Sequence, residues 1–188
     1  MNRRVIIIGA GGHAMVVADV VRSAGDIVVG FFDDSKAKGS DYYGASVLGS
    51  IEDCAKYKDE YEAIIAIGNN ETRKEIAEKY SLNWYTAIHK SAVVSPSASL
   101  GCGTVVMPLA IVNANASVGL HAIVNSGAIV EHDCKIGSYT QLASGSVLCG
   151  GSLVGENVLI GAGATVTVGA RVADNERVEP NGVVYKDI

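Results

Sequence analysis

An aliphatic residue stands at every sixth position through the second half of the chain. The series starts at Ile88 and runs without a gap to Val184. A period of six matches neither the α-helical repeat near 3.6 residues nor the simple alternation of a β-strand. It is the hexapeptide signature of a parallel β-helix, in which each hexad forms one short strand and one corner. The pattern therefore predicts a solenoid.

The size of the hexad has a geometric reason. Three hexads make one triangular coil of about 18 residues, and coils stacked about 4.8 Å apart pair each strand with the strands above and below. Two positions before most of the aliphatics the residue is small, as at Ala110, Ala128 and Ser146, which suits a tight corner. We expect about five uninterrupted coils in the left-handed form, an exception to the right-handed crossover rule.

The first part of the chain has a different pattern, in which apolar β runs alternate with amphipathic helices. The expected strands cover residues 5–8, 27–32 and 63–67, and the expected helices cover 13–24, 51–57 and 71–80. The first helix would carry Met15, Val16, Val20 and Val21 on one face. Alternation of this kind predicts half of a nucleotide-binding sheet. We therefore expect an α/β domain over residues 1–85 and a left-handed parallel β-helix over 86–188.

Composition and charge narrow the function classes. The 188 residues are 48% hydrophobic and carry a formal net charge of -5, which argues against nucleic acid or an anionic membrane as the main partner. The early apolar run is broken at Gly9, so we interpret it as a strand and not as a secretion signal. The four cysteines show no CxxC spacing, and no metal-binding cluster is visible. A reduced, cytoplasmic protein is the simplest interpretation.

A glycine-rich turn links the first strand to the first helix. Gly9 and Gly11 with Ala14 give a spacing that can seat a phosphate or ribose at a helix N-terminus. Asp33 and Asp34 end the second strand, where a carboxylate can accept hydrogen bonds from sugar hydroxyls. A plain tight turn is the alternative. Fewer than about 90 residues leave no second half for a full NAD site, so a mononucleotide or nucleotide-sugar is the better-sized ligand.

Charge is concentrated at one point of the solenoid. Between Ser91 and Gly155 the formally charged residues are Glu131, Asp133 and Lys135, and they surround His132. A histidine is suited to proton transfer near neutral pH, and an adjacent carboxylate can orient its ring and raise its basicity. The alternative is a solvated corner. His89 and His121 lack such neighbours and are interpreted as structural, and Cys134 as a packed corner thiol.

These segments together resemble a known family. The resemblance rests on Gly9–His13, Phe32–Asp34, Ala66–Arg73, Ile88–Ala92 and Asn125–Asp133. The chain is similar to the nucleotide-sugar N-acetyltransferases and sialic acid O-acetyltransferases that join a small α/β domain to a left-handed β-helix. The Gly68-Asn69-Asn70-x-x-Arg73 segment favours the amino-sugar branch, which includes the UDP-4-amino-sugar acetyltransferases of the bacillosamine pathway.

The resemblance implies acetyl transfer from acetyl-CoA to the 4-amino group of a UDP-linked deoxysugar, without a metal, in a homotrimer with active sites between neighbouring prisms. It implies that His132 is the general base and that Asp133 increases its basicity. The positions that match family residues holding the nucleotide-sugar are Gly11, Gly12, His13, Asp33, Asp34 and Gly68, with Asn125 near the acceptor. The positions that match the acetyl-CoA groove are Gln141, Gly150, Ala162 and Val168. The N–H of Gly150 would stabilise the thioester oxyanion.

Two positions depart from the family pattern. Gln141 stands where many relatives carry a second histidine, and an amide can hydrogen-bond but cannot titrate. The segment Asn181–Lys186 differs from the usual Gly-x-Pro-Ala-Lys cap near CoA. Two alternatives remain open: an O-acetyltransferase acting on sialic acid or a related sugar with the same base, and a non-enzymatic β-solenoid such as an ice-binding or scaffold protein. The latter would need regular ladders of Thr on an outer face.

Overall fold

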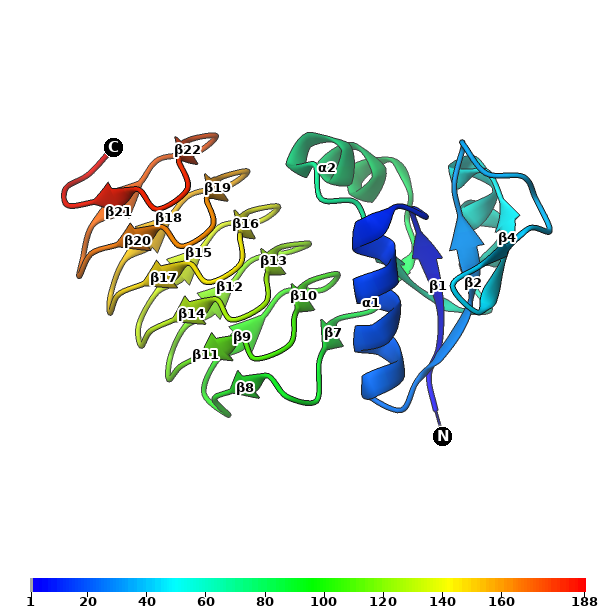
Figure 1. Cartoon of the computed structure of the whole chain (residues 1–188), viewed down its shortest axis with the longest axis horizontal. Coiled ribbons are helices and arrows are strands. Elements are labelled where there is room, and N and C mark those ends of the chain that lie inside the picture. The colour runs from blue at the N-terminus through cyan, green and yellow to red at the C-terminus, as the bar shows by residue number, and fades with distance from the viewer. Residues whose placement is uncertain (1) are drawn as a thin grey trace.

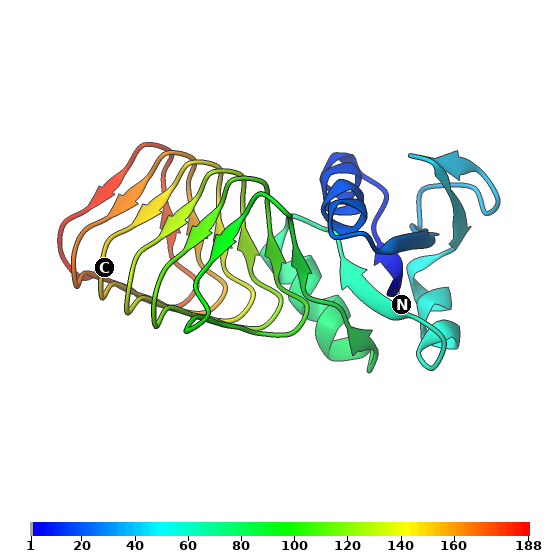
Figure 2. The same ribbon diagram turned by 90° about the horizontal axis from the view of Figure 1, so that it is seen from below.

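The computed structural model describes residues 2–188 and consists of an α/β part followed by a long solenoid (Figure 1). The two parts lie side by side along the long axis, with α1 between the sheet of the α/β part and the solenoid. Figure 2 shows the coils as a stack of similar loops that ends at the C-terminus. The predicted fold class, an α/β domain followed by a left-handed parallel β-helix, is confirmed.

The α/β part is built on one sheet with the strand order β3-β4-β2-β1-β5-β6. Its strands are β1 (Arg4–Ile8), β2 (Ile27–Phe32), β3 (Asp41–Tyr42), β4 (Ala45–Gly49), β5 (Glu62–Ile65) and β6 (Asn83–Trp84). Its helices are α1 (Gly12–Ser23), the 3₁₀ helix η1 (Ile51–Tyr57) and α2 (Asn70–Lys79). All pairs are parallel except the β3–β4 hairpin. The side chains of α1 pack on one face of the sheet, and those of η1 and α2 pack on the other.

One expectation for this part was wrong, because Met15 and Val16 do not share a face with the buried Val20 and Val21, and one element was missed. Met15 and Val16 do not face the core, because they are 38% and 39% exposed. Ala14, Val17 and Ala18 are buried in their place. The small alanines let the helix approach the sheet closely, and their spacing of three and four residues continues to the buried Val21. The β3–β4 hairpin was not predicted, since strands this short leave too little alternation to recognise.

The solenoid consists of two-residue strands that stack into three parallel sheets. One is named here for the domain that it faces, and the other two for the polarity of their outward side chains. The domain-facing sheet contains β7 (Ala87–Ile88), β10 (Val105–Val106), β13 (Ile123–Val124), β16 (Gln141–Leu142), β19 (Leu159–Ile160) and β22 (Arg177–Val178). The apolar sheet contains β8 (Val93–Val94), β11 (Ile111–Val112), β14 (Ile129–Val130), β17 (Val147–Leu148), β20 (Thr165–Val166) and β23 (Val183–Val184). The polar sheet contains β9 (Ser99–Leu100), β12 (Ser117–Val118), β15 (Lys135–Ile136), β18 (Leu153–Val154) and β21 (Arg171–Val172).

The hexad aliphatics fill the interior of the prism as predicted. Val106, Val130 and Leu142 are fully buried, and so are the small corner residues such as Ala128 and Ser146. The pattern weakens in the first coil, where Ile88 is 36% exposed because no coil lies beneath it. Each Å² of apolar surface removed from water contributes roughly 25 cal/mol to stability. Burial of one aliphatic side chain per hexad is therefore the main source of stability in the solenoid.

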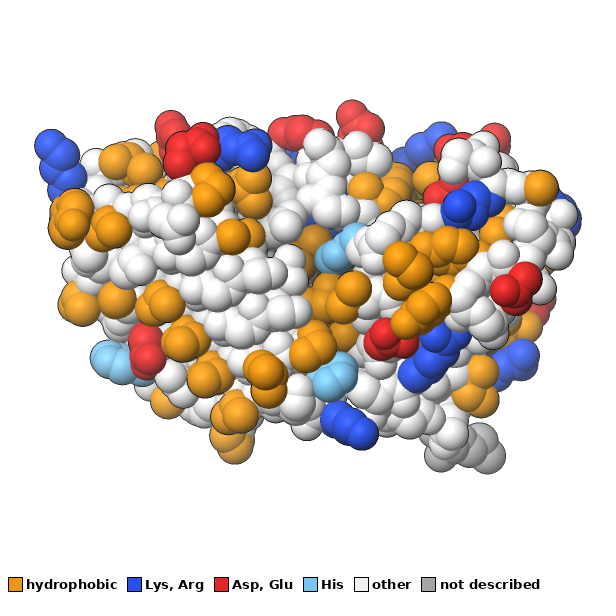
Figure 3. Space-filling view, viewed as in Figure 1, with side chains coloured by type: hydrophobic (Ala, Val, Ile, Leu, Met, Phe, Trp, Pro, Cys, Tyr) orange, Lys and Arg blue, Asp and Glu red, His pale blue; other side chains and the backbone are white. Residues whose placement is uncertain are grey.

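The outer faces of the three sheets differ in polarity. The outward residue of each strand in the apolar sheet is aliphatic except Thr165, and the series reads Val93, Ile111, Ile129, Val147, Thr165, Val183. The polar sheet instead presents Ser99, Ser117, Lys135, Leu153 and Arg171. In Figure 3 hydrophobic side chains run diagonally across the solenoid, and the middle of this face shows almost no charge. No regular threonine ladder is present on these faces within residues 2–188.

Candidate functional site

The glycine turn presents an open helix N-terminus. Gly9 is fixed by its environment, because its φ is +106° and a Cβ there would lie 2.9 Å from Cγ1 of Ile67. At Gly11 and Gly12, by contrast, an added Cβ would meet nothing within 4 Å. Gly11 caps α1 without a side-chain hydrogen bond, and the first turn carries no acid. Backbone N–H groups at a positive helix end with free volume in front of them suit a phosphate.

The two aspartates at the end of β2 accept hydrogen bonds from the loops around the glycine turn. Asp33 accepts hydrogen bonds from the N–H of Ala10 at 2.7 Å and from the hydroxyl of Ser35 at 2.6 Å. Burial alone would raise the pKa of Asp33, but these hydrogen bonds outweigh it and hold the pKa below its usual value. Asp34 accepts from the N–H of Ile51 at 2.8 Å. Asp33 is therefore an anion that holds the glycine turn through the N–H of Ala10.

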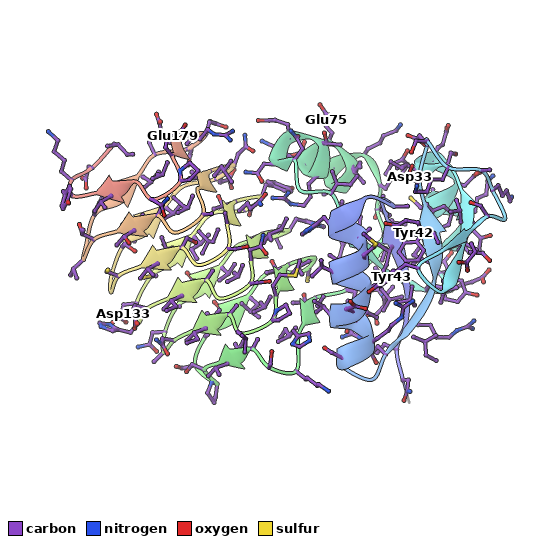
Figure 4. The ribbon with its side chains drawn as sticks, in the orientation of Figure 1. Asp33, Tyr42, Tyr43, Glu75, Asp133 and Glu179 are labelled. Atoms are coloured by element: carbon purple, nitrogen blue, oxygen red, sulfur yellow. The ribbon has the colours of Figure 1, made fainter. Side chains whose placement is uncertain are left out.

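Sequence patterns missed two residues beside this turn. The hydroxyl of Tyr42 in β3 donates to the carbonyl of Gly11 at 2.8 Å, and the ring packs edge-on against Phe31. Nζ of Lys36 lies 5.0 Å from the centre of the Tyr42 ring. Figure 4 shows Asp33 and Tyr42 on the α/β side of the molecule. No signal marked them, because their placement depends on the short hairpin that was not predicted.

A histidine–carboxylate pair occupies the corner between the apolar and polar sheets. We name this the His132 corner; it comprises residues 131–134 and the stacked segments 149–152 and 167–170. Nδ1 of His132 lies 2.8 Å from Oδ2 of Asp133, and the amide of Asn115, one coil below, donates to Oδ1 of Asp133 at 3.3 Å. These hydrogen bonds, that with His132 first, lower the pKa of Asp133. Both oxygens of the carboxylate are thus engaged, and Asn115 is a contact that sequence patterns did not single out.

Gly150 forms the surface on which the His132 ring rests. It lies one coil further along the same column, and an added Cβ would come within 2.7 Å of Nε2 of His132. The N–H of Gly150 donates to no backbone carbonyl among residues 2–188. Val168 follows one coil later and is 78% exposed. The corner therefore combines a proton acceptor, an uncommitted backbone donor and an exposed apolar side chain.

The remaining candidate residues lie elsewhere on the solenoid. Asn125 and Ala162 belong to the corner between the domain-facing and apolar sheets, named here the Asn125 corner (residues 125–128, 143–146 and 161–164). Gln141 lies in β16 of the domain-facing sheet. Gln141 and Gly68 line one cavity of about 280 Å³ where the N-terminus of α2 meets the solenoid. One predicted CoA residue and one predicted sugar residue thus meet within a single chain.

A single chain keeps the two halves of the candidate site apart. The His132 corner and the Asn125 corner are opposite edges of the apolar sheet. Figure 4 shows Asp133 at the outer edge of the solenoid, on the far side of the molecule from Asp33 and Tyr42. The geometry of one chain therefore leaves His132 remote from the glycine turn.

Two histidines near the junction of the two parts are held neutral. His121 is 3% exposed and packs between Trp84 and Tyr139, and His13 at the start of α1 has its Nε2 buried without a hydrogen-bond partner. Burial, and then the positive charge of Arg73, lower the pKa of each to about 4. A neutral His13 beside the glycine turn retains a lone pair that can accept a hydrogen bond.

These histidines predict an acid-labile fold. A histidine in the unfolded chain takes up its proton near pH 6.5, whereas His121 in the folded chain does so near pH 4. Between these values the unfolded state binds more protons, so stability falls as the pH is lowered from 6.5 to 4. The cost attributable to His121 is about 2 kcal/mol at pH 5. Urea unfolding at several pH values measures it, and His121→Phe should flatten the dependence. An unchanged slope in that variant would contradict the assignment.

Comparisons with known proteins agree across the chain. The family model "PglD N-terminal domain" matches residues 4–80, and the model "Bacterial transferase hexapeptide (six repeats)" matches residues 133–168. A histidine-to-alanine mutant of GDP-perosamine N-acetyl transferase from Caulobacter crescentus, solved with CoA and GDP-perosamine, is 36% identical; the match covers 98% of this chain and 89% of that one, with a TM-score of 0.93.

Two further relatives fit the same picture. The acetyltransferase domain of PglB from Neisseria gonorrhoeae FA1090, solved in complex with acetyl coenzyme A, is 33% identical over 100% of this chain and 93% of that one, with a TM-score of 0.93. UDP-N-acetylbacillosamine N-acetyltransferase of Bacillus subtilis (strain 168) is 36% identical over 109 residues, which are 54% of this chain and 50% of that protein. The matched region spans half or less of the curated relatives' own length.

Proposed function

Because the chain belongs to the family of nucleotide-sugar N-acetyltransferases that join a PglD-type α/β domain to a hexapeptide-repeat β-helix, we propose that it acetylates an amino-deoxysugar linked to a nucleotide. Acetyl-CoA is the donor, and the 4-amino group of the sugar is the acceptor. The observation that carries the proposal is the His132 corner, where an imidazole hydrogen-bonded to a carboxylate lies beside Gly150, whose N–H donates to no backbone carbonyl among residues 2–188.

The corner supplies what amide formation from a thioester requires. The lone pair of the acceptor amine attacks the thioester carbonyl, and Nε2 of His132 takes the proton that the nitrogen loses. The carbonyl oxygen becomes an oxyanion that accepts from the N–H of Gly150. When the C–S bond breaks, the carbonyl re-forms and the thiolate of CoA leaves, receiving a proton from His132 or solvent. The acetyl group thus moves directly from sulfur to nitrogen.

A homotrimer completes the site in this proposal. The apolar sheet presents aliphatic side chains such as Ile111, Ile129 and Val147 outward along its length, and no segment of the chain covers them within residues 2–188. Three such faces packed around a threefold axis bring the His132 corner of one copy next to the Asn125 corner of its neighbour. The base then meets the nucleotide-sugar held by that neighbour, with CoA in the groove between the two corners.

The roles of the binding residues follow from this arrangement. Gly11, Gly12, His13 and Gly68 hold the diphosphate and sugar together with Asp33 and Asp34. Asp33 also accepts from the N–H of Ala10 in the glycine turn. Gln141, Gly150, Ala162 and Val168 line the acetyl-CoA groove. Gln141 and Ala162 lie on its acceptor side, beside Asn125, and Gly150 and Val168 lie on the side that carries the base. The amide of Gln141 can hydrogen-bond the acetyl or sugar group without taking up a proton.

A screen by mass spectrometry tests the function directly. UDP-, GDP-, CMP- and dTDP-linked 4-amino sugars are each incubated with acetyl-CoA, in parallel with hydroxyl acceptors that include sialic acid. We expect acetylation of at least one nucleotide-linked amino sugar and free CoA in equal amount. Acetylation of hydroxyl acceptors alone would replace the proposal with O-acetyl transfer, and no acetylation of any acceptor would reject it.

Replacing Gly12 by valine should weaken binding of the nucleotide-sugar by at least about 10-fold, because the side chain would fill the space in front of the helix N-terminus. The folded chain has room for it, since an added Cβ meets nothing within 4 Å. Affinity for acetyl-CoA should therefore stay unchanged. Isothermal titration calorimetry with each ligand measures both.

Gly9→Val is the contrasting variant. It requires a side chain at a φ of +106° and against Ile67, so it should destabilise the fold and lower binding of both ligands together. If Gly12→Val behaved in the same way, its effect would be structural and the assignment of the nucleotide pocket would be wrong.

A further inference from the structure

A buried arginine links the loop that carries Gly68 to two coils of the solenoid. Arg73, in the first turns of α2, is 1% exposed. Its Nε donates to the carbonyl of His121 at 2.7 Å. Nη1 donates to the carbonyls of Ile67 and Gly68 at 3.0 and 3.2 Å. Nη2 donates to Oδ1 of Asn70 and to the carbonyl of Tyr139, at 2.7 and 2.6 Å. Every N–H of the guanidinium therefore has an acceptor.

The acceptors are unusual for a buried cation. Within residues 2–188 Arg73 forms no ion pair, and all five hydrogen bonds go to neutral oxygens. A buried charge without a counter-ion is costly, and only its hydrogen bonds to these oxygens offset that cost. Packing alone thus gives little reason for an arginine here. A rigid planar fork with five fixed donors does give one, because it holds several backbone segments at set positions.

The segments that Arg73 holds are those that carry the candidate site. Gly68 lies in the loop between β5 and α2. His121 and Tyr139 occupy equivalent corners one coil apart, with φ of 50° and 62°. The strands that follow them are β13, which leads to Asn125, and β16, which begins with Gln141. Arg73 therefore joins the nucleotide-sugar part to the two coils that line the acceptor side of the groove.

Other contacts keep the two parts together without Arg73. The amide of Asn70 donates to the carbonyl of Val158 at 3.0 Å, and the amide of Asn157 donates to Glu71. Tyr85, Ala87 and Met107 belong to the same apolar cluster as α1. Loss of the guanidinium would therefore leave the domains docked but free to change their angle.

We propose that Arg73 is a positioning residue. It sets the spacing between the β5–α2 loop, which carries Gly68, and the acceptor side of the solenoid groove. The inference rests on the proposed function. A small misplacement of reacting groups costs up to about 10²-fold in rate even when each ligand still binds, because the near-attack geometry is lost. The role belongs to the shape of the guanidinium and not to its charge, so lysine should not replace it.

The experiment compares Arg73→Met, Arg73→Lys and the wild type. For both variants we expect kcat to fall by about 10- to 100-fold, while Kd for CoA and for the nucleoside diphosphate that the wild type binds changes less than about 3-fold. Arg73→Met should lose some thermal stability, because five buried acceptor oxygens lose their donor, so kcat is measured well below the melting temperature of the variant. Ile76→Val is the matched control: it trims a buried residue of the same helix that packs against the sheet in a cluster without solenoid residues, and it should leave kcat unchanged.

Hydrogen–deuterium exchange gives a readout that needs no turnover. In Arg73→Met, exchange should rise in residues 66–72 and at the corners around 121 and 139, and nowhere else. Wild-type kcat in Arg73→Met, rescue by lysine, or unchanged exchange would each overturn the positioning role. A parallel loss of kcat and nucleotide affinity would assign Arg73 to binding instead. A wild-type chain without any turnover would reject the proposed function, and the exchange data would then decide the role of Arg73 on their own.

Discussion

Replacing His132 by alanine should lower turnover by about 10²–10⁴-fold, the usual contribution of a positioned general base. The ring is exposed at a corner and packs on Gly150, so its removal leaves the interior of the prism intact. Affinity for acetyl-CoA and for the nucleotide-sugar should change little. Steady-state rates and calorimetry on the same preparation measure both quantities.

Two companion variants sharpen this test. Asp133→Asn should lower turnover less than His132→Ala, because an amide can still hold the ring in place while its charge is lost. His89→Ala removes a ring whose hydrogen bonds among the described residues go only to Ser91, and it should leave turnover unchanged. Near wild-type turnover in His132→Ala would contradict the general-base assignment, leaving proximity and the Gly150 N–H as the catalytic devices.

The solenoid was predictable because its pattern is local and repeated. Each hexad has an inward aliphatic residue and a small corner residue, such as Val130 and Ala128, which are both buried. Because the same pattern recurs in every hexad, the prediction does not depend on any single position. The α1 helix shows the opposite case. Its apolar residues outnumber the buried stripe, and only contact with both the sheet and the solenoid decides that Ala14 and Val17 are inside while Met15 is not.

The residues of the His132 corner could be singled out from the sequence because they are neighbours in the chain. His132 and Asp133 are adjacent, and an isolated cluster of charge in a nearly uncharged stretch marked them. Tyr42 and Arg73 were not assigned a role, because their contacts join segments more than 30 residues apart in sequence. The presence of an arginine does not by itself predict that its guanidinium will donate to backbone carbonyls of two different coils. Such contacts follow from the docking of the two parts, which the sequence pattern of either part does not contain.

Replacing Val130 by aspartate should unfold the central coils of the prism. Val130 is fully buried in β14, between its strand partners Val112 in β11 and Leu148 in β17. An unpaired carboxylate there costs several kcal/mol, on the order of a large share of the stability of a domain this size. Circular dichroism should show a lower or absent thermal transition, and turnover should be lost because the unfolded coils include the one that carries His132.

The neighbouring Ile129→Asp variant is the matched control, because it makes the same chemical change one residue earlier on the opposite side of the strand. Ile129 points outward on the apolar sheet and is only half-buried in the single chain. Its carboxylate would be solvated in a monomer, so the chain should keep its fold and secondary structure. In a trimer packed through this face it would be buried, so light scattering should report monomers and turnover should fall with the loss of the neighbouring subunit. A stable Val130→Asp protein would contradict the inward orientation of that residue, and a fully trimeric, active Ile129→Asp protein would place the subunit interface on another face of the solenoid.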